Sequence, residues 1–193
     1  LVHRIDKDTS GLLVIAKNND VHQKLAQQIS ENKMNREYIA IVDGHFAHET
    51  GVIDAPLSRH QTNRLKRVVE KGGKNAVTHF EVLDAFSDYS LVSCRLETGR
   101  THQIRVHMAH ISHPLLGDQT YGGRPRPPKN ASEAFTEVLR NFKRQALHAA
   151  MLRLAHPITG EIMEWYAPLP DDFVELLHDL KADYLEPKDE LDY

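Results

Sequence analysis

Hydrophobic residues recur along the chain with two different spacings. Segments in which every second residue is apolar, and short continuous apolar runs, predict β-strands. The first such run reads GLLVIAK and is typical of a buried strand. The last two strands are joined by a predicted turn over His156–Gly160, which contains a proline and ends in glycine. The predicted strands are Gly11–Lys17, Arg36–Val42, Val77–Phe86, Tyr89–Glu97, Ala149–Leu154 and Glu161–Tyr166.

Apolar residues three or four positions apart predict helices in the segments between these strands. One helix follows Asn18–Asp20, whose side chains can cap it. Another begins after Pro170, because proline is favoured in the first turn of a helix. The apolar positions are Val21, Leu25 and Ile29 in the first helix, Ile104, Met108 and Ile111 along Thr101–His110, and Phe173, Leu176, Leu177 and Leu180 in the last, with a further helix over Ser132–Phe142.

The order of these elements predicts the fold class. Strands outnumber helices and seldom alternate with them one for one, which favours an α+β protein with a largely antiparallel sheet over a doubly wound parallel one. The length of 193 residues is within the range of one domain. Ser58–Asn75 and Arg124–Lys129 show neither spacing and are predicted to be irregular basic loops, the first with six Lys or Arg against one acid.

The net charge of −3 hides an uneven distribution along the chain. The segment Asp171–Tyr193 holds nine Asp or Glu and two Lys, a local charge of −7. The other 170 residues therefore carry +4, and most of the 13 histidines lie among them. We interpret the acidic segment as a solvated helix face and terminus, and the mildly basic body is compatible with a nucleic-acid partner.

Cysteine content and hydropathy exclude several classes of protein. A single cysteine, Cys94, excludes an intrachain disulfide framework and a cysteine-based zinc site, and it fits a reducing cytoplasm. The mean hydropathy is −0.49 and there is no long apolar run, so we expect no membrane-spanning helix. The chain begins at Leu1 inside an information-rich segment, and we therefore expect it to be a piece of a longer protein.

The first candidate chemical segment is His3–Gly11, where polar and charged residues crowd in front of a predicted strand. Asp6 and Asp8 stand two apart, with Arg4 and Lys7 beside them. A carboxylate next to cations stays ionised below its free pKa of about 3.9, which suits a nucleophile or base better than an acid. The alternative is an ordinary turn with a surface ion pair.

The second candidate segment is Leu96–Arg105, a turn that leads into the predicted helix with two arginines, a histidine and a glutamine. If both arginines were helical, Arg100 and Arg105 would point about 140° apart, so we expect them to have different partners. The alternative is a pair of phosphate-binding or surface arginines with no catalytic part.

Three histidines, His107, His110 and His113, follow at three-residue spacing, with Asp118 nearby. A metal site is one interpretation, and a metal-dependent phosphoesterase using the first two histidines and Asp118 is the corresponding alternative function. Three-residue steps drift around a helix, however, and no HExxH pattern exists. We expect these histidines to lie on a polar face or near phosphates and predict no metal.

Four longer stretches resemble the RluA family of pseudouridine synthases. LVHRIDKDTSGLLVIAK is similar to the segment that holds the family's catalytic aspartate, and REYIAIVDG to its tyrosine motif. RLETGRTHQIRVHMAHISHPLLGD resembles the arginine motif, and LHAAMLRLAHPITGE the C-terminal strand pair. The four matches fall in the family's order and cover nearly the whole chain.

This resemblance implies a pseudouridine synthase fold, with a mixed, mainly antiparallel sheet flanked by helices and a central RNA-binding cleft. Residues 1–193 would form the catalytic domain, and an S4-like RNA-binding domain would precede them in the full protein. The implied activity is isomerisation of uridine to pseudouridine in a stem-loop of large-subunit ribosomal RNA after base flipping. The reaction needs no redox cofactor, metal or ATP. The implied partner is large-subunit ribosomal RNA or a pre-ribosomal particle. The protein is expected to be a cytoplasmic monomer that does not contact a membrane.

The resemblance also implies roles for individual residues. Asp6 matches the catalytic aspartate, and Arg105 the arginine that pairs with it. Tyr38 matches the tyrosine that stacks on the target uracil, and its hydroxyl is a candidate for proton transfer at C5. Arg4 matches the residue that fills the space left by the flipped base. Candidates for phosphate contacts are Arg100, Lys66, Arg67, Arg124 and Arg126.

The sequence leaves two points undecided: the chemical step that Asp6 performs, and whether the chain is an enzyme or a non-catalytic module. Asp6 could act by attacking or stabilising the sugar at C1′, by attacking the base, or by removing a sugar proton. A non-catalytic RNA-binding module is the alternative function, since it would keep the basic loops. Such a module would not require Asp6, Tyr38 and Arg105 together, and all three are present.

Overall fold

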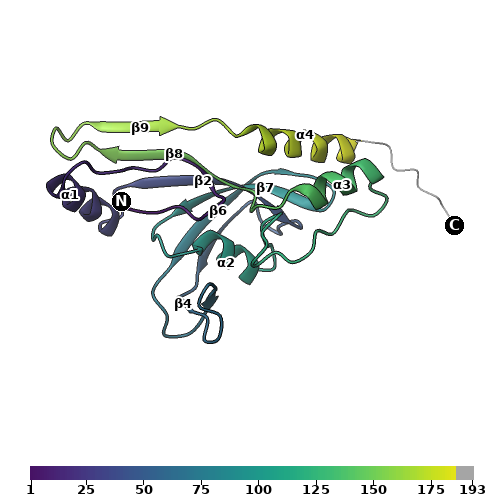
Figure 1. Cartoon of the computed structure of the whole chain (residues 1–193), viewed down its shortest axis with the longest axis horizontal. Coiled ribbons are helices and arrows are strands. Elements are labelled where there is room, and N and C mark those ends of the chain that lie inside the picture. Colours follow the sequence, from purple (N-terminus) through teal and green to yellow (C-terminus); the bar gives the residue numbers. More distant parts are fainter. Residues whose placement is uncertain (186–193) are drawn as a thin grey trace.

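A seven-stranded sheet forms the centre of the protein in the computed structural model, which describes residues 1–185 (Figure 1). The strand order is β1-β8-β2-β7-β6-β3, and β9 pairs with the later part of β8 on the same edge as β1. Among the described strands only β1 and β8 run parallel. The predicted α+β class with a mainly antiparallel sheet is therefore confirmed. The strands are β1 (Ser10–Gly11), β2 (Asn35–Asp43), β3 (Thr50–Asp54), β6 (Val77–Ala85), β7 (Tyr89–Leu96), β8 (Leu147–Ala155) and β9 (Ile162–Tyr166).

Within residues 1–185 four helices lie around this sheet, and each agrees within a few residues with a predicted one. Asn18 accepts a hydrogen bond from the Val21 amide at 2.9 Å, so the predicted cap of the first helix is formed. Ser132, for which no cap was predicted, accepts a hydrogen bond from the Phe135 amide at 3.1 Å and caps α3 in the same way. The part of the predicted acidic segment from 186 to 193 lies outside the described residues. The helices are α1 (Asn19–Ser30), α2 (Gln103–His110), α3 (Glu133–Asn141) and α4 (Asp171–Leu185).

The two faces of the sheet pack against different helices, with β2 at the centre between β7 and β8. On one face, Tyr38 and Val92 meet Ile104 and Met108 of α2. On the other face a second cluster joins the sheet to α3 and α4, which lie along one end of the molecule (Figure 1). The buried residues of that cluster include Ile41, Tyr89, Phe135, Leu139, Phe173, Leu176 and Leu180.

The prediction of a strand over Gly11–Lys17 is wrong, because only Ser10–Gly11 pairs with β8. Gly11 has a φ of 111°, and a Cβ at this position would lie 2.2 Å from the Ala149 carbonyl oxygen, so the chain turns where only glycine fits. Beyond this point the Val14 amide donates to the His3 side chain at 3.1 Å instead of to a neighbouring strand. The alternate apolar side chains still pack, against a cluster with Leu25 and Leu152.

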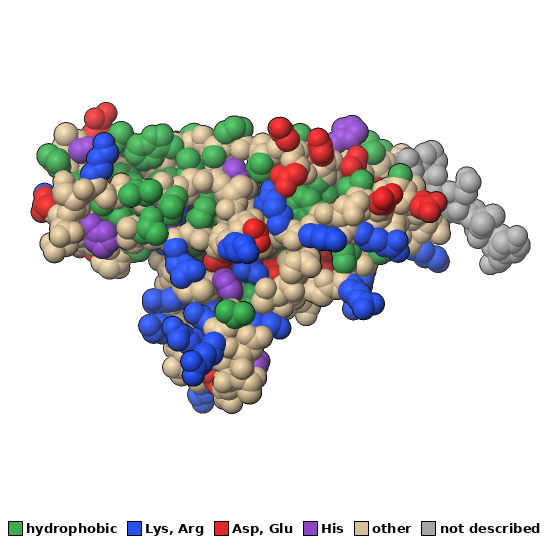
Figure 2. All heavy atoms as spheres, viewed as in Figure 1, with side chains coloured by type: hydrophobic (Ala, Val, Ile, Leu, Met, Phe, Trp, Pro, Cys, Tyr) green, Lys and Arg blue, Asp and Glu red, His purple; other side chains and the backbone are tan. Residues whose placement is uncertain are grey.

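The basic stretch Ser58–Asn75, predicted to be irregular, contains strand pairing. β4 (Leu57–Arg59) and β5 (Arg67–Val69) form a separate two-stranded sheet that projects from the body (Figure 1). Lys and Arg side chains gather on this projection (Figure 2). Strands of three residues are too short to show a hydrophobic period, which is why β4 and β5 were not predicted. The five-residue strand β3 was not predicted either.

Candidate active site

Asp6 lies in a turn that leads into β1, with its side chain 13% exposed. The Thr9 amide donates to the Asp6 carbonyl at 3.0 Å, and Asp8 closes the turn with a φ of 68°. Gln145, two residues before β8 begins, donates to the Lys7 carbonyl at 2.7 Å and so ties the turn to the sheet. Asp8 is exposed, so of the two neighbouring carboxylates only Asp6 reaches the interior of the site.

Arg105 reaches Asp6 from α2, but its main partner is another carboxylate. Its Nη1 lies 3.5 Å from Asp6 Oδ2. Its Nε and Nη2 donate to the two carboxylate oxygens of Asp118 at 2.7 and 2.9 Å, in a bidentate pair. Burial lowers the pKa of Arg105, but the hydrogen bond and charge of Asp118, followed by the charge of Asp6, outweigh it and raise the pKa. Arg105 is therefore a fixed cation.

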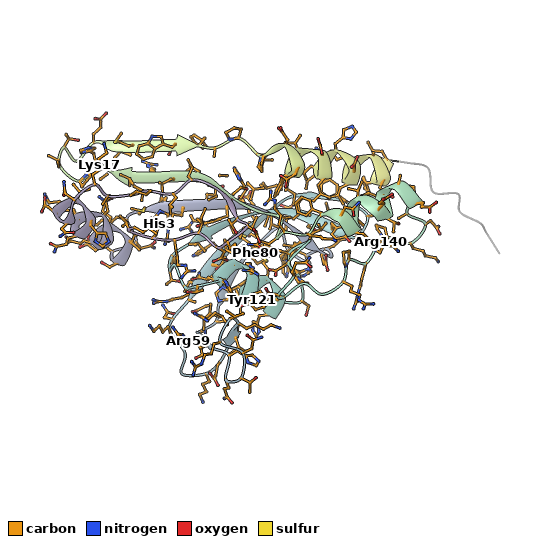
Figure 3. All side chains as sticks on the ribbon, viewed as in Figure 1. His3, Lys17, Arg59, Phe80, Tyr121 and Arg140 are labelled. Atoms are coloured by element: carbon orange, nitrogen blue, oxygen red, sulfur yellow. The ribbon has the colours of Figure 1, made fainter. Side chains whose placement is uncertain are left out.

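Tyr121 holds the same guanidinium from another side, and its position beside α2 is visible in Figure 3. The Arg105 guanidinium carbon lies 5.1 Å from the centre of the Tyr121 ring. The Tyr121 hydroxyl accepts a hydrogen bond from the Arg67 amide at 2.8 Å and pairs with His102 Nδ1 at 2.8 Å. The basic β4–β5 projection is thus connected to the arginine that contacts Asp6.

Tyr38 is 6% exposed on the central strand β2, and it faces α2. Burial raises its pKa, the positive charge of Arg36 opposes that shift, and the charge of Asp6 adds to it. The phenol is therefore neutral at physiological pH.

One cavity joins Asp6 and Tyr38 with the exposed side chains of Arg4 and Arg100. Arg105 lies behind Asp6, so the structure brings together the three predicted catalytic residues and two of the predicted RNA-binding ones. Arg36 and His102 also line this cavity. His102 belongs to the second candidate segment, where it was given no role of its own, and sequence reasoning missed Arg36. Arg36 stands two residues before Tyr38, and that spacing on a strand was the available signal for it.

The remaining basic candidates divide between two places. Arg67 lines a hollow between the β4–β5 projection and the loop Gly99–Thr101, and that loop also borders the cavity. Lys66 precedes β5 on the same projection. Arg124 and Arg126 line a different hollow, beside Asp43, and the structure does not bring them to the cavity.

The histidines considered as metal ligands point to different partners. His107 pairs with the Thr78 hydroxyl through Nδ1 and with the Ala55 carbonyl through Nε2, both at 2.9 Å. His113 pairs with the Asp43 carbonyl at 2.7 Å, and both oxygens of Asp118 bind Arg105. Within residues 1–185 no three His, Cys, Asp or Glu side chains converge as a metal site. No helix of this part of the chain is long and apolar enough to cross a membrane.

The fold and this cavity define the class of protein. The model of the RNA pseudouridylate synthase family matches residues 1–110, and the chain belongs to that family. The structure is similar to human RNA Pseudouridylate Synthase Domain Containing 4, with a TM-score of 0.74 and 28% identity, over 94% of this chain and 75% of that one. For human RNA Pseudouridylate Synthase Domain Containing 1, the TM-score is 0.68 at 27% identity, over 88% and 68% of the two chains. The predicted pseudouridine synthase fold is confirmed.

Curated relatives narrow the comparison within the family. The chain is 65% identical to Ribosomal large subunit pseudouridine synthase D of Haemophilus influenzae and 61% identical to that of Pasteurella multocida, over all 193 residues. The Escherichia coli K12 protein of the same name is 54% identical. Ser58–His60 and Tyr121–Phe135 resemble synthase D within the family, and these relatives confirm that resemblance. The chain spans 59% of the length of each of these relatives.

Proposed function

We propose that this chain is the catalytic domain, residues 1–193, of an enzyme that isomerises uridine to pseudouridine in a stem-loop of large-subunit ribosomal RNA. The observation that carries the proposal is the shared cavity of Asp6 and Tyr38, with Arg105 fixed behind Asp6 and exposed arginines at the rim. The names of the similar bacterial proteins support the choice of RNA.

The proposed reaction rearranges bonds within one nucleotide. The N1–C1′ bond breaks, the uracil turns, and a C5–C1′ bond forms, while C5 loses a proton and N1 takes one up. Nothing is oxidised and no group leaves the molecule. Asp6 is the carboxylate that supports this change, by attack on the sugar, by attack on the base, or by removal of a sugar proton.

Arg105 orients Asp6 rather than neutralising it. Asp118 takes the two short hydrogen bonds of the guanidinium, and Asp6 takes only the 3.5 Å contact. Asp6 is therefore oriented by a fixed positive charge and keeps lone pairs free for chemistry. In this proposal Asp118 is a positioning residue, since it acts through Arg105.

The other side chains of the cavity would bind the flipped nucleotide. Tyr38 offers a ring on which uracil can stack, worth roughly 1–3 kcal/mol per base. Arg4 is exposed at the rim, where it can enter the RNA and fill the space left by the base. Phosphate contacts are proposed for Arg100, Lys66 and Arg67 next to the cavity, and for Arg124 and Arg126 farther along the RNA.

The full protein is proposed to carry an S4-like RNA-binding domain before residue 1, and the similar bacterial proteins are longer than this chain. Each phosphate contact that the chain lacks reduces the slope of log affinity against log salt concentration by about 0.7–0.9. The chain alone should thus bind the stem-loop more weakly and with a shallower salt dependence than the full protein. Equal slopes would contradict the extra domain.

Two other functions are less well supported by the geometry. A non-catalytic RNA-binding module would use the basic projection but gives no reason for a partly buried carboxylate and a buried tyrosine at one cavity, with a buried arginine behind the carboxylate. A metal-dependent phosphoesterase would need His107 and Asp118, yet both are hydrogen-bonded to other parts of the protein.

The direct experiment maps pseudouridine in ribosomal RNA from cells with and without the gene, and restores the full protein on a plasmid. Loss of particular large-subunit pseudouridines that return on complementation is the expected result. A parallel incubation of purified protein with the stem-loop and a strong chelator should leave conversion intact. An unchanged pseudouridine map would contradict the proposed function, and loss of conversion with the chelator would favour a metal enzyme.

A further inference from the structure

Arg36 is a buried cation without a partner in the described part of the chain. It is 5% exposed, and its Nε atom is buried without a hydrogen-bond partner. No carboxylate oxygen of residues 1–185 lies within 4.0 Å of its guanidinium nitrogens. A buried charge is expensive unless something pairs with it, so an unpaired one points to a ligand that supplies the acceptor.

The position of Arg36 shows where that ligand must lie. Arg36 and Tyr38 are two apart on β2, both are buried, and alternate residues of a strand face the same side. Both line the cavity that contains Asp6. A Cβ at Gly99 would lie 2.6 Å from Arg36 Nη1, so the absence of a side chain at position 99 leaves room for the guanidinium in the cavity wall.

The neighbouring groups leave this charge uncompensated. His3 lies along β2 (Figure 3), and burial, followed by the positive charge of Arg36, lowers its pKa to about 4. It is therefore neutral at physiological pH. Arg105 already has Asp118 and Asp6 as partners, whereas Arg4 and Arg100 are exposed at the rim and accessible to phosphates. Arg36 is buried too deeply for a phosphate that stays at the surface, so its acceptor has to enter the cavity.

The proposed isomerisation produces such an acceptor. When N1–C1′ breaks, the electron pair of the bond goes to the uracil, which becomes an anion with charge shared among N1 and the two carbonyl oxygens. The sugar C1′ becomes electron-poor. The ring then donates a pair from C5 to C1′, C5 gives up its proton, and N1 takes one up, so atoms and electrons balance without another reactant.

We propose that Arg36 is a further catalytic residue, whose guanidinium stabilises the negative charge on the uracil ring as N1–C1′ breaks. This inference rests on the proposed function. Alternate residues of a strand lie about 7 Å apart, so a uracil stacked on Tyr38 presents an edge toward Arg36. Uridine itself is neutral, so the interaction becomes strong only as charge develops, and this difference lowers the barrier.

The test compares Arg36→Met and Arg36→Lys with the unchanged protein, with excess enzyme on an rRNA stem-loop, beside a binding titration and a melting curve. One matched control is Arg95→Met, an exposed arginine opposite Glu37 on the neighbouring strand, which should change none of the three measurements. Arg36→Met should lower the single-turnover rate roughly 100- to 1,000-fold, as loss of a preorganised donor does. RNA affinity should stay within about threefold, and Arg36→Lys should recover part of the rate, because it keeps the charge.

The melting curve separates this role from a structural one. Removal of an unpaired buried charge should leave the melting temperature of Arg36→Met equal or higher. A lower melting temperature with an unchanged rate would make Arg36 structural and overturn the inference. Weaker binding, a salt slope reduced by about 0.7–0.9 and a normal rate at saturation would make it a phosphate contact and overturn it equally.

Gly99→Ala provides a second variant, which keeps Arg36 but displaces its guanidinium through the added Cβ. It should lower the rate, and the double variant with Arg36→Met should be no slower than Arg36→Met alone, since both act on one interaction. Full activity of Gly99→Ala, or rate losses that multiply, would contradict the proposed placement. If the unchanged protein fails to convert the stem-loop, the proposed function fails. If it converts the stem-loop and Arg36→Met is equally fast, only this inference fails.

Discussion

Two arginine–aspartate pairs share the same bidentate geometry and differ in burial, and they allow a matched test of how Arg105 is held. Arg105 donates through Nε and Nη2 to Asp118 at 2.7 and 2.9 Å, and Arg144 donates through the same atoms to Asp172 at 2.6 and 2.9 Å. The Asp118 side chain is 0% exposed, whereas that of Asp172 is 48% exposed. The perturbation is Asp→Asn at each aspartate.

The expected magnitudes follow from burial. Breaking a buried pair costs about 3–5 kcal/mol, because the remaining charge is left without compensation. Asp118→Asn belongs at the low end, about 3 kcal/mol, because Asn keeps one acceptor oxygen and Asp6 stays 3.5 Å from the guanidinium. An exposed pair is worth only about 0–1 kcal/mol. For a chain of this size, the melting temperature should fall by about 6–12 °C for Asp118→Asn and by no more than about 4 °C for Asp172→Asn.

Catalysis should separate the two variants further. In Asp118→Asn the guanidinium turns toward Asp6, and a displacement of about 1 Å at a reacting group can cost up to roughly 100-fold in rate. Asp172→Asn should leave the rate of stem-loop conversion unchanged. The assays are urea unfolding, thermal melting and single-turnover conversion at a temperature where both variants are folded. Equal losses of stability in the two variants, or a normal rate for Asp118→Asn, would refute the positioning role of Asp118.

Two further predictions concern Tyr38 and His3. Tyr38→Phe keeps the stacking ring and should bind the RNA almost as tightly while its single-turnover rate falls; an unchanged rate would leave Tyr38 as a stacking surface only. The pKa of His3 is lowered from 6.5 to about 4, so neutral His3 contributes stability that is complete above pH 6.5 and is lost as the pH falls toward 4. The stability of the protein, measured by urea unfolding, should therefore drop between pH 6.5 and 4 relative to His3→Gln, and parallel curves would show that His3 is not buried as described.

Much of the architecture could be predicted because local chemistry decides it. Asn18 and Ser132 cap the helices that the spacing of apolar residues predicts. The alternation in Val77–Phe86 and Tyr89–Glu97 becomes the antiparallel pair β6 and β7. The strand predicted after Gly11 is wrong because the segment has the hydrophobic pattern of a strand, while the pairing with β8 ends at the close contact of Gly11 with Ala149. Hydrophobic pattern specifies burial, but hydrogen-bond partners depend on the rest of the fold.

The residues of the candidate site that lie within sequence motifs could be predicted. Those that act through contacts with residues distant in the sequence could not. Asp6, Tyr38 and Arg105 come from motifs that the resemblance identified. Asp118 was considered only as a metal ligand, because nothing local shows that it pairs with a side chain 13 positions earlier. Arg36 was overlooked because a charged residue in a strand is usually exposed.

The central claim is that the Asp6 carboxylate does the chemistry, and Asp6→Asn tests it most directly. Asn is nearly isosteric, so the turn before β1 should survive, and Arg105 keeps both contacts to Asp118. The amide is a poor nucleophile and a poor base, so every route open to the carboxylate fails. The measurement is single-turnover conversion of an rRNA stem-loop by excess enzyme, with a binding titration, and with deamidation to Asp excluded by mass spectrometry. We predict no pseudouridine at nearly unchanged RNA affinity, and measurable conversion by the Asn variant would contradict the assignment of Asp6.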